Sequence, residues 1–463
     1  MANVRDWAHR QRVSLSQFKL IPFLQMASAS FTGRLFKNSA WGMLGLVIRV
    51  ILGVVQVGLM TRALSVEQYG ILTVIMVFPT LVQNLAGFRT SEFVARYCTE
   101  ALERGDPDRA GQLAVIGWTL DGAVGLAAFV IVLLAAQTYL TTTLGDARYT
   151  YLLDLYALIV ISNATFATAR ALLQVFGRFD LLFYILISNA VLRLALVALV
   201  FWRGWGLVGL VVVSTVASIV EPLSAFVVSL HQARRRMRLA PGRPVWAYAR
   251  AHRREFISFL GAGYVEGTAQ ALSRNADVVL LSAIRGPAEV GMYQVAAQIV
   301  GYTANMLTPM GQAILPDLQR SIGLPRPQWM RRLRHVTLFV GGLSLVGALA
   351  VYLLAPWMIH LVVGDKFLPA AGAVRIMIWS MVFSGALFWL FPLMLALRYQ
   401  WLRVASVILS GASQIAFLAL LVPRFGYQGA AWAFLLFSIL APMPMLIFLL
   451  RWKGPAAPAP ASG

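Results

Sequence analysis

Long apolar stretches dominate this chain and restrict what it can fold into. A helix that crosses a bilayer needs about 20 mostly apolar residues, and twelve stretches meet that requirement. They lie at approximately 39–60, 70–87, 112–136, 150–173, 181–202, 206–230, 257–283, 292–315, 336–356, 372–396, 404–422 and 428–450. With 59% hydrophobic and only 12% charged residues, the chain has too little polar surface for a soluble domain. The sequence predicts an all-α polytopic membrane protein.

Short motifs recur about 220 residues apart, which indicates an internal duplication. The matched pairs are Gly206-Leu207-Val208-Gly209 with Gly426-Tyr427-Gln428-Gly429, Gly145-Asp146 with Gly364-Asp365, Tyr69-Gly70 with Gly291, and Arg178-Phe179 with Arg398-Tyr399. Six helices per half is an even number, so both halves enter the membrane in the same direction. We therefore expect two six-helix bundles around a central cleft, related by a pseudo-two-fold axis along the membrane normal.

The duplication also predicts how the chain is divided. We expect a cytoplasmic segment at 1–38, an N-terminal bundle at 39–230, a basic cytoplasmic linker at 231–256, a C-terminal bundle at 257–450 and a disordered cytoplasmic tail at 451–463.

Basic residues mark one side of the predicted membrane. The linker alone carries Arg234, Arg235, Arg236, Arg238, Arg243, Arg250, Arg253 and Arg254, whereas loops on the opposite side have one basic residue each: Arg62, Arg148, Arg203, Arg285, Lys366 and Arg424. By the positive-inside rule, both termini are expected in the cytoplasm. The net charge of +21 is explained by this topology, so it does not indicate a nucleic-acid partner. Attraction of the linker to anionic lipid is a second interpretation.

Several arginines fall inside predicted spans, where a lipid-facing position costs about 2.5–3.5 kcal/mol each. Arg49, Arg193 and Arg274 lie far from the span ends, so we expect them to face a cavity or a partner. The first span places Arg49 and Gln56 on one face, and the seventh places Glu266, Gln270, Arg274 and Asp277 on one face. Because these spans are equivalent in the repeat, the two polar stripes are expected to face each other across the cleft. Alternatively, Arg274 and Asp277 neutralise each other structurally.

Further polar residues extend the predicted pathway. Gln298 and Asn305 lie on one side of the eighth span. Amides suit sugar hydroxyls, but they also hold helices together, and both interpretations stay open. Asp121, Glu266 and Asp277 are acids that could couple transport to a proton or sodium ion.

Motifs of catalysis and nucleotide binding are missing from the sequence. It has no GxxxxGK[ST] phosphate loop and no HExxH motif, its five histidines are scattered, and it has one cysteine, Cys98. We therefore expect no enzymatic activity, no cofactor and no metal site. Energy would then come from an ion gradient, the membrane potential or the substrate gradient.

The chain resembles the polysaccharide exporters, or O-antigen and exopolysaccharide repeat-unit flippases, of the multidrug/oligosaccharidyl-lipid/polysaccharide (MOP) exporter superfamily. The motifs that carry the resemblance span about residues 38 to 450. They are Leu64-Ser65-Val66-Glu67-Gln68-Tyr69-Gly70, Ala95-Arg96-Tyr97 with Glu100, Ser273-Arg274-Asn275-Ala276-Asp277, Glu289-Val290-Gly291-Met292-Tyr293, Leu315-Pro316 and Arg424-Phe425-Gly426-Tyr427-Gln428-Gly429-Ala430.

This resemblance implies a MATE-like fold in the bacterial inner membrane. It also implies that alternating access moves an undecaprenyl-diphosphate-linked oligosaccharide between leaflets, with a polysaccharide polymerase and other assembly proteins as candidate partners. Arginine suits the anionic diphosphate, so the expected substrate-binding residues are Arg49, Gln56, Arg193, Gln270, Arg274, Gln298 and Asn305.

Three alternatives stay open. One is a cation-coupled multidrug antiporter that uses Glu266, Asp277 or Asp121. Another is a lipid II flippase, although members of that group usually have two more carboxy-terminal helices. The third is a membrane scaffold that transports nothing.

Overall fold

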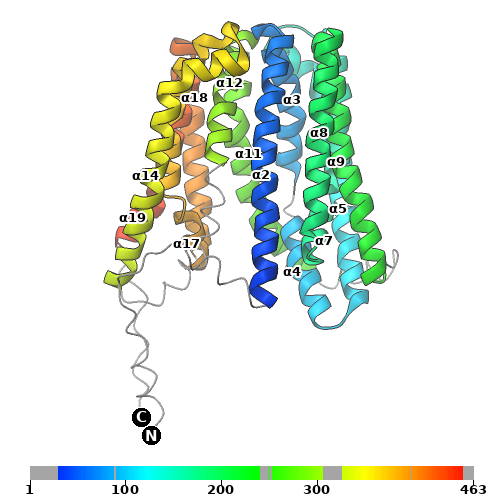
Figure 1. The fold of residues 1–463 in the computed structure, drawn as a ribbon. Helices are drawn as coiled ribbons and strands as arrows, with labels where there is room; N and C mark the ends of the chain where they lie inside the picture. Colours follow the sequence, from blue (N-terminus) through cyan, green and yellow to red (C-terminus); the bar gives the residue numbers. More distant parts are fainter. Residues whose placement is uncertain are drawn as a thin grey trace.

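Helices account for the regular structure of the residues that the computed structural model describes, which are 30–87, 90–239, 250, 253–305, 326–397 and 399–451 (Figure 1). Nine stretches of these residues are long and apolar enough, by length and composition, to cross a membrane. The last of them, 401–451, contains two of the predicted spans. The prediction of an all-α polytopic membrane protein is confirmed.

The first half of the chain forms eight helices with clear local signals at their ends. They are α2 (Ser30–Ala63), α3 (Val66–Ala86), α4 (Thr90–Glu103), α5 (Pro107–Leu144), α6 (Thr150–Ala164), α7 (Phe166–Val175), α8 (Phe179–Arg203) and α9 (Gly206–Arg236). A capping box starts α3, because Ser65 Oγ accepts from Gln68 N at 3.1 Å and Gln68 Oε1 accepts from Ser65 N at 3.2 Å. Gly145 ends α5 with a φ of 67°, a conformation that favours glycine.

The second half is more broken. Its elements are α11 (Arg253–Arg285), α12 (Pro287–Asn305), α14 (Arg326–Met358), the π-helical turn η2 (Ile359–Val363), the 3-10 helix η3 (Asp365–Ala370), α15 (Ala371–Met377), α16 (Trp379–Ala386), α17 (Leu390–Ala396), α18 (Gln400–Leu440) and α19 (Met443–Arg451). Gly426 interrupts α18 with a φ of 57° and a ψ of −135°. Two helical parts therefore flank Gly426, which lies between the predicted spans 404–422 and 428–450.

The sequence repeat is also visible in the backbone. Arg178 precedes α8 with φ −92° and ψ 57°, and Tyr399 precedes α18 with φ −93° and ψ 52°. Gly206 and Gly426 have φ values of 58° and 57°. The same turns therefore recur in both halves, although one of these pairs is offset by one residue from the sequence match.

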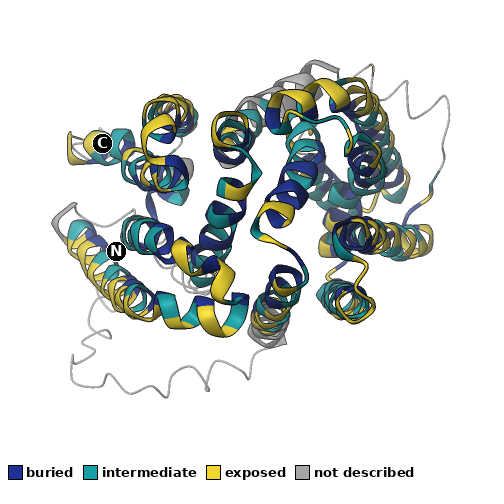
Figure 2. Cartoon of the chain, turned by 90° about the horizontal axis from the view of Figure 1, so that it is seen from above, coloured by how far each residue is buried: buried dark blue, intermediate teal, exposed yellow. Residues whose placement is uncertain are grey.

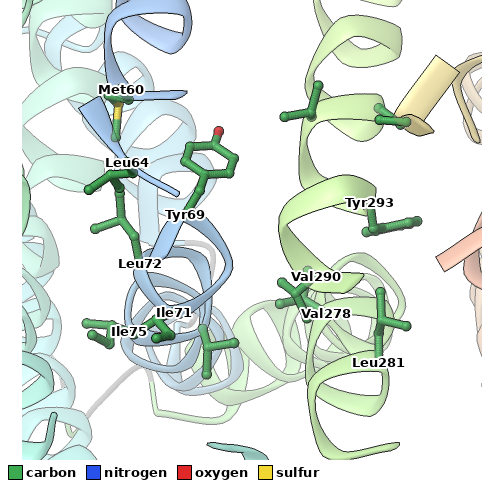
Figure 3. Close-up of a cluster of buried hydrophobic side chains, with 14 of the residues drawn as sticks. Met60, Leu64, Tyr69, Ile71, Leu72, Ile75, Val278, Leu281, Val290 and Tyr293 are labelled. Atoms are coloured by element: carbon green, nitrogen blue, oxygen red, sulfur yellow. The ribbon is translucent and has the colours of Figure 1, made fainter. Parts of the chain in front are cut away.

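Buried apolar residues form one cluster shared by the two halves and one further cluster in each half. The shared cluster includes Tyr69 and Leu72 of α3 together with Val290 and Tyr293 of α12 (Figure 3). The separate clusters centre on Phe93 and its neighbours in α4, α5 and α7, and on Trp389 and its neighbours in α14, α17 and α18. The halves are thus joined by a common core at one end and have their own cores at the other.

The outer faces of the helices are apolar and exposed (Figure 2). Leu134 on α5 is 80% exposed, Val346 on α14 is 66% exposed and Leu420 on α18 is 66% exposed. Exposed apolar surface of this extent is suited to contact with lipid tails.

At the shared core, α3 and α12 touch backbone to backbone in a reciprocal contact that we call the packed end. A Cβ on Gly70 would lie 1.7 Å from Pro287 O, and a Cβ on Gly291 would lie 2.4 Å from Val66 O. Val66 and Gly70 each lie 221 residues before their counterparts, Pro287 and Gly291. The repeat axis therefore passes through this contact, and only glycine allows such a close approach.

The carboxyl end of α2 joins the other half beside the packed end. Thr61 Oγ1 donates to Val363 O at 3.0 Å, and Arg62 Nη2 donates to Leu361 O at 2.7 Å. Both carbonyls belong to the π-helical turn η2. Hydrogen bonds as well as apolar contacts therefore hold the halves together at this end.

Candidate functional site

A cavity of about 420 Å³, which we call the arginine chamber, lies between α2, α3, α8, α9 and α12. Its polar lining comes from Arg49, Gln56, Asn189, Arg193, Ser214, Glu221, Gln298, Tyr302 and Asn305. Five of the expected binding residues are therefore brought together from three helices, namely Arg49, Gln56, Arg193, Gln298 and Asn305.

Positive charge predominates in the arginine chamber. Arg49 is exposed and Arg193 is half-buried, and in the described part of the chain neither forms an ion pair. Arg193 Nη2 donates to Ser218 Oγ at 3.4 Å, while its buried Nε has no partner among the described residues. The one acid in the lining, Glu221, accepts from Asn189 Nδ2 at 2.6 Å. The chamber therefore carries an excess positive charge that can attract an anion.

Hydrogen bonds fix Gln298 in the arginine chamber more firmly than they fix Gln56. Tyr69, from the packed end, donates its hydroxyl to Gln298 Oε1 at 2.9 Å, so this amide connects the two regions. Gln56 Nε2 makes only a weak contact with Met60 Sδ at 3.6 Å. Gly53 allows the hydroxyl group of Tyr302 to approach α2 closely, because a Cβ on residue 53 would lie 2.8 Å from that oxygen.

A second cavity of about 310 Å³, which we call the amide chamber, lies between α3, α4, α5, α6, α7 and α11. Four amide side chains line it: Gln83, Asn84, Asn163 and Gln270. The expected coupling acid Asp121 also faces it and is 8% exposed. Thr90 Oγ1 donates to Asp121 Oδ1 at 2.5 Å, and Thr168 N donates to Asp121 Oδ2 at 3.3 Å.

The predicted stripes on the first and seventh spans do not line the same cavity in the described residues. Arg49 and Gln56 of α2 line the arginine chamber, whereas Gln270 of α11 lines the amide chamber. The main partners are equivalent, because α2 packs on α8 and α11 packs on α18, but α11 also packs on α3 and α5 of the first half, whereas α2 also packs on η2. For the described side chains of the two stripes, the expectation that they face each other across one cleft is therefore not met.

The remaining expected residues either lie apart from both chambers or have side chains that the structure does not describe. Asp277 is 7% exposed and accepts hydrogen bonds from the Tyr293 hydroxyl and from Val278 N. The side chains of Glu266 and Arg274 lie outside the described residues, so their predicted roles stay predictions. No group of three or more His, Cys, Asp and Glu residues that could hold a metal ion occurs in the described ranges.

Sequence reasoning missed part of the site. The missed residues are Asn189, four residues before the expected Arg193 on α8, and Ser214 and Ser218, seven and three residues before the acid Glu221 on α9. That spacing, on one face of each helix, is the signal that could have identified them. Asn163 carries no such signal, because it is a single amide at the end of α6.

Comparison with known proteins identifies the family to which this architecture belongs. Residues 35–321 match the sequence profile of the family described as "Polysaccharide biosynthesis protein". The chain belongs to this family. The matched residues include most of the lining of both chambers, so the site described above is a feature of a polysaccharide biosynthesis protein.

One curated relative and several solved structures are also similar to this chain. This polysaccharide biosynthesis protein is 23% identical over 338 residues to "Inner membrane protein YghQ" of Escherichia coli (strain K12), covering 73% of this chain and 94% of the relative. The fold is similar to an inward-facing multidrug resistance MATE family transporter of the MOP superfamily, with a TM-score of 0.71, 13% identity and coverage of 87% and 94%. It is also similar to the lipid II flippase MurJ in an inward closed conformation, with a TM-score of 0.67, 12% identity and coverage of 90% and 87%. The predicted MATE-like fold is confirmed.

Proposed function

We propose that this protein flips a diphosphate-linked oligosaccharide, with undecaprenyl diphosphate as the lipid carrier, across a bacterial inner membrane. The observation that carries the proposal is the excess positive charge of the arginine chamber, where Arg49 and Arg193 have no ion-pair partner among the described residues. Guanidinium groups bind diphosphate oxygens in a bidentate manner. A drug cation would be repelled by the same pair of charges.

Alternating access is supported by the distribution of the core. The halves share apolar packing at the packed end and have separate clusters at the other, so one end can separate while the other stays closed. With both termini in the cytoplasm, as basic-residue placement predicts, the end with separate cores faces the cytoplasm. This orientation lets the substrate enter from the inner leaflet, where it is synthesised.

Ion coupling is proposed for an acid that lines a chamber. Of the two coupling acids expected from the sequence whose side chains are described, Asp121 meets this condition, whereas Asp277 lies inside the contact between α11 and α12. Asp121 therefore becomes the first candidate for exchange of a proton or sodium ion. A cation-coupled drug antiporter would use the same acid, and the charge of the transported molecule separates the two proposals.

The test uses reconstituted protein and a short-chain lipid diphosphate that carries a fluorescent oligosaccharide. Arg49→Gln and Arg193→Gln each remove a charged hydrogen-bonding group worth about 1.5–3 kcal/mol, so we expect translocation to fall at least about 10-fold. Arg203→Gln is the matched control, because Arg203 lies exposed at the end of α8, the same helix as Arg193. Full translocation by both chamber variants at normal protein levels would contradict the proposal.

A further inference from the structure

The amide chamber has a lining that differs in chemistry from the arginine chamber. Glycine and alanine form much of its wall, including Gly125, Ala128, Ala164 and Ala167. Its size of about 310 Å³ lies at the lower end of the range for small-molecule sites. The small residues leave the space open, and the long amides reach into it from α3 and α11.

The four amide side chains of this chamber are uncharged, and their hydrogen-bonding groups are available to a ligand. In the described part of the chain, the side chains of Gln83, Asn84, Asn163 and Gln270 form no hydrogen bond with another protein group. Each amide offers both a donor and an acceptor, which matches the hydroxyl and acetamido groups of sugars. Among the described residues, no Lys or Arg side chain belongs to the lining, and the buried carboxylate of Asp121 opposes a negative charge. The chamber therefore suits an uncharged, hydroxyl-rich ligand and disfavours an anion.

The fourth predicted span passes from α6 to α7 where it lines this chamber. Helix α6 ends at Ala164 and α7 begins at Phe166, and the residues around this junction, Asn163, Ala164 and Ala167, belong to the lining. Thr165 between them keeps a right-handed helical conformation, with φ −79° and ψ −9°, so the two helices form one continuous span, Thr150–Val175. This junction adds small residues and one amide to the wall of the chamber.

The two chambers lie along one helix at a separation that fits one substrate. Met76 of α3 lines the arginine chamber and Gln83 of the same helix lines the amide chamber. Seven residues along an α-helix correspond to about 10 Å, roughly the length of two linked sugar rings. A diphosphate held by the arginines would therefore place its attached sugars within reach of the amides.

We infer that the amide chamber is a binding site for the uncharged glycan part of the substrate, and that it selects against acidic sugars at this position. The inference rests on the proposed function and extends it to substrate class. The arginine chamber would supply affinity for the lipid diphosphate that substrates have in common. The amide chamber would then recognise the sugars, which are the part of the substrate that varies.

Calorimetry on the full chain in lipid nanodiscs tests this division. The probes are farnesyl diphosphate, the same lipid diphosphate carrying a neutral trisaccharide, and its counterpart with a uronic acid in the trisaccharide. We expect the neutral trisaccharide to bind about 10-fold tighter than farnesyl diphosphate, the effect of one or two neutral hydrogen bonds. The acidic trisaccharide should bind at least about 3-fold weaker than the neutral one, because it would approach Asp121.

Two variants from opposite walls make the test specific. Asn163→Leu on α6 and Gln270→Leu on α11 should reduce the gain from the neutral trisaccharide to about 2-fold or less, while leaving the affinity for farnesyl diphosphate unchanged. Gln137→Leu is the matched control, because Gln137 is an exposed amide on α5 outside both chambers. Thermal unfolding of each variant checks that the fold is intact.

The outcomes separate this inference from the proposed function. Retention of the full gain in both folded variants, or equal binding of the acidic and neutral trisaccharides, would overturn the amide-chamber assignment alone. If the wild-type protein binds farnesyl diphosphate no better than farnesol, the proposed function fails, and the assignment that rests on it fails as well.

Discussion

Helices α3 and α12 behave differently at their two ends. Near their amino ends, Gly70 and Gly291 bring the two backbones into direct, reciprocal contact. Towards their carboxyl ends, α3 contributes Gln83 to the amide chamber and α12 contributes Asn305 to the arginine chamber. The repeat is thus preserved where the halves touch and is lost where they enclose polar cavities. The symmetric part of the molecule is the contact between α3 and α12, and the asymmetric part is the lining of the two chambers.

Substitution at the packed end should give the largest effect. Gly70→Ala places a Cβ 1.7 Å from Pro287 O, a backbone atom that cannot move alone. Overpacking of this kind costs about 1–3 kcal/mol and occasionally more, so we expect a lower thermal unfolding midpoint for the purified protein. The control is Gly301→Ala on α12, where a Cβ meets nothing within 4 Å. This control should be as stable as the wild type or up to about 1 kcal/mol more stable. Equal stability of the two variants would show that the helices do not touch at Gly70.

Gly206 and Gly426 are equivalent in the repeat, and alanine substitutions at these two positions should have a smaller effect than Gly70→Ala. Both have positive φ, so alanine should cost at least about 1–2 kcal/mol at either position from backbone strain. Gly426→Ala should cost more, because its Cβ would also lie 2.2 Å from Glu289 Oε2, the atom that accepts from Tyr427 N at 2.6 Å. Around Gly206 nothing lies within 4 Å of the added Cβ. Unfolding midpoints of the two alanine variants measure the difference, and a lower midpoint for Gly206→Ala would contradict it.

The smallest effect is expected at Asp277. Its carboxylate accepts from the Tyr293 hydroxyl within the α11–α12 contact, and Asp277→Asn keeps an acceptor oxygen at that place. We expect translocation to persist and stability to fall by about 1 kcal/mol or less. Asp277→Leu, which leaves the buried hydroxyl of Tyr293 without an acceptor, should cost about 1–3 kcal/mol. Loss of translocation in a stable Asp277→Asn variant would instead assign this acid to ion coupling.

The membrane fold and the repeat could be predicted because their signals are local. Apolar stretches of sufficient length predict helices, and Gly206 and Gly426 match in sequence because positive φ favours glycine in both halves. The positions of the polar side chains depend on which helices pack together. Arg49 and Gln270 occupy related spans, yet they line different chambers because α11 packs on α3 and α5 in addition to α18, whereas α2 packs on α8 and η2. Asn163 could not have been identified from the sequence, since a single amide in an apolar segment has no periodic pattern.

The hydrogen bonds from Thr61 and Arg62 to η2 form a reversible tie between the halves. Each is worth roughly 0.5–3 kcal/mol, and water can replace the protein carbonyl when the halves separate. Their sum is comparable to the few kcal/mol that separate alternative conformations of one protein. The resting conformation can therefore be shifted by a single substitution at this tie, without any change to the chambers. Proteins of the same architecture could in this way differ in which side of the membrane is open at rest while handling the same kind of molecule.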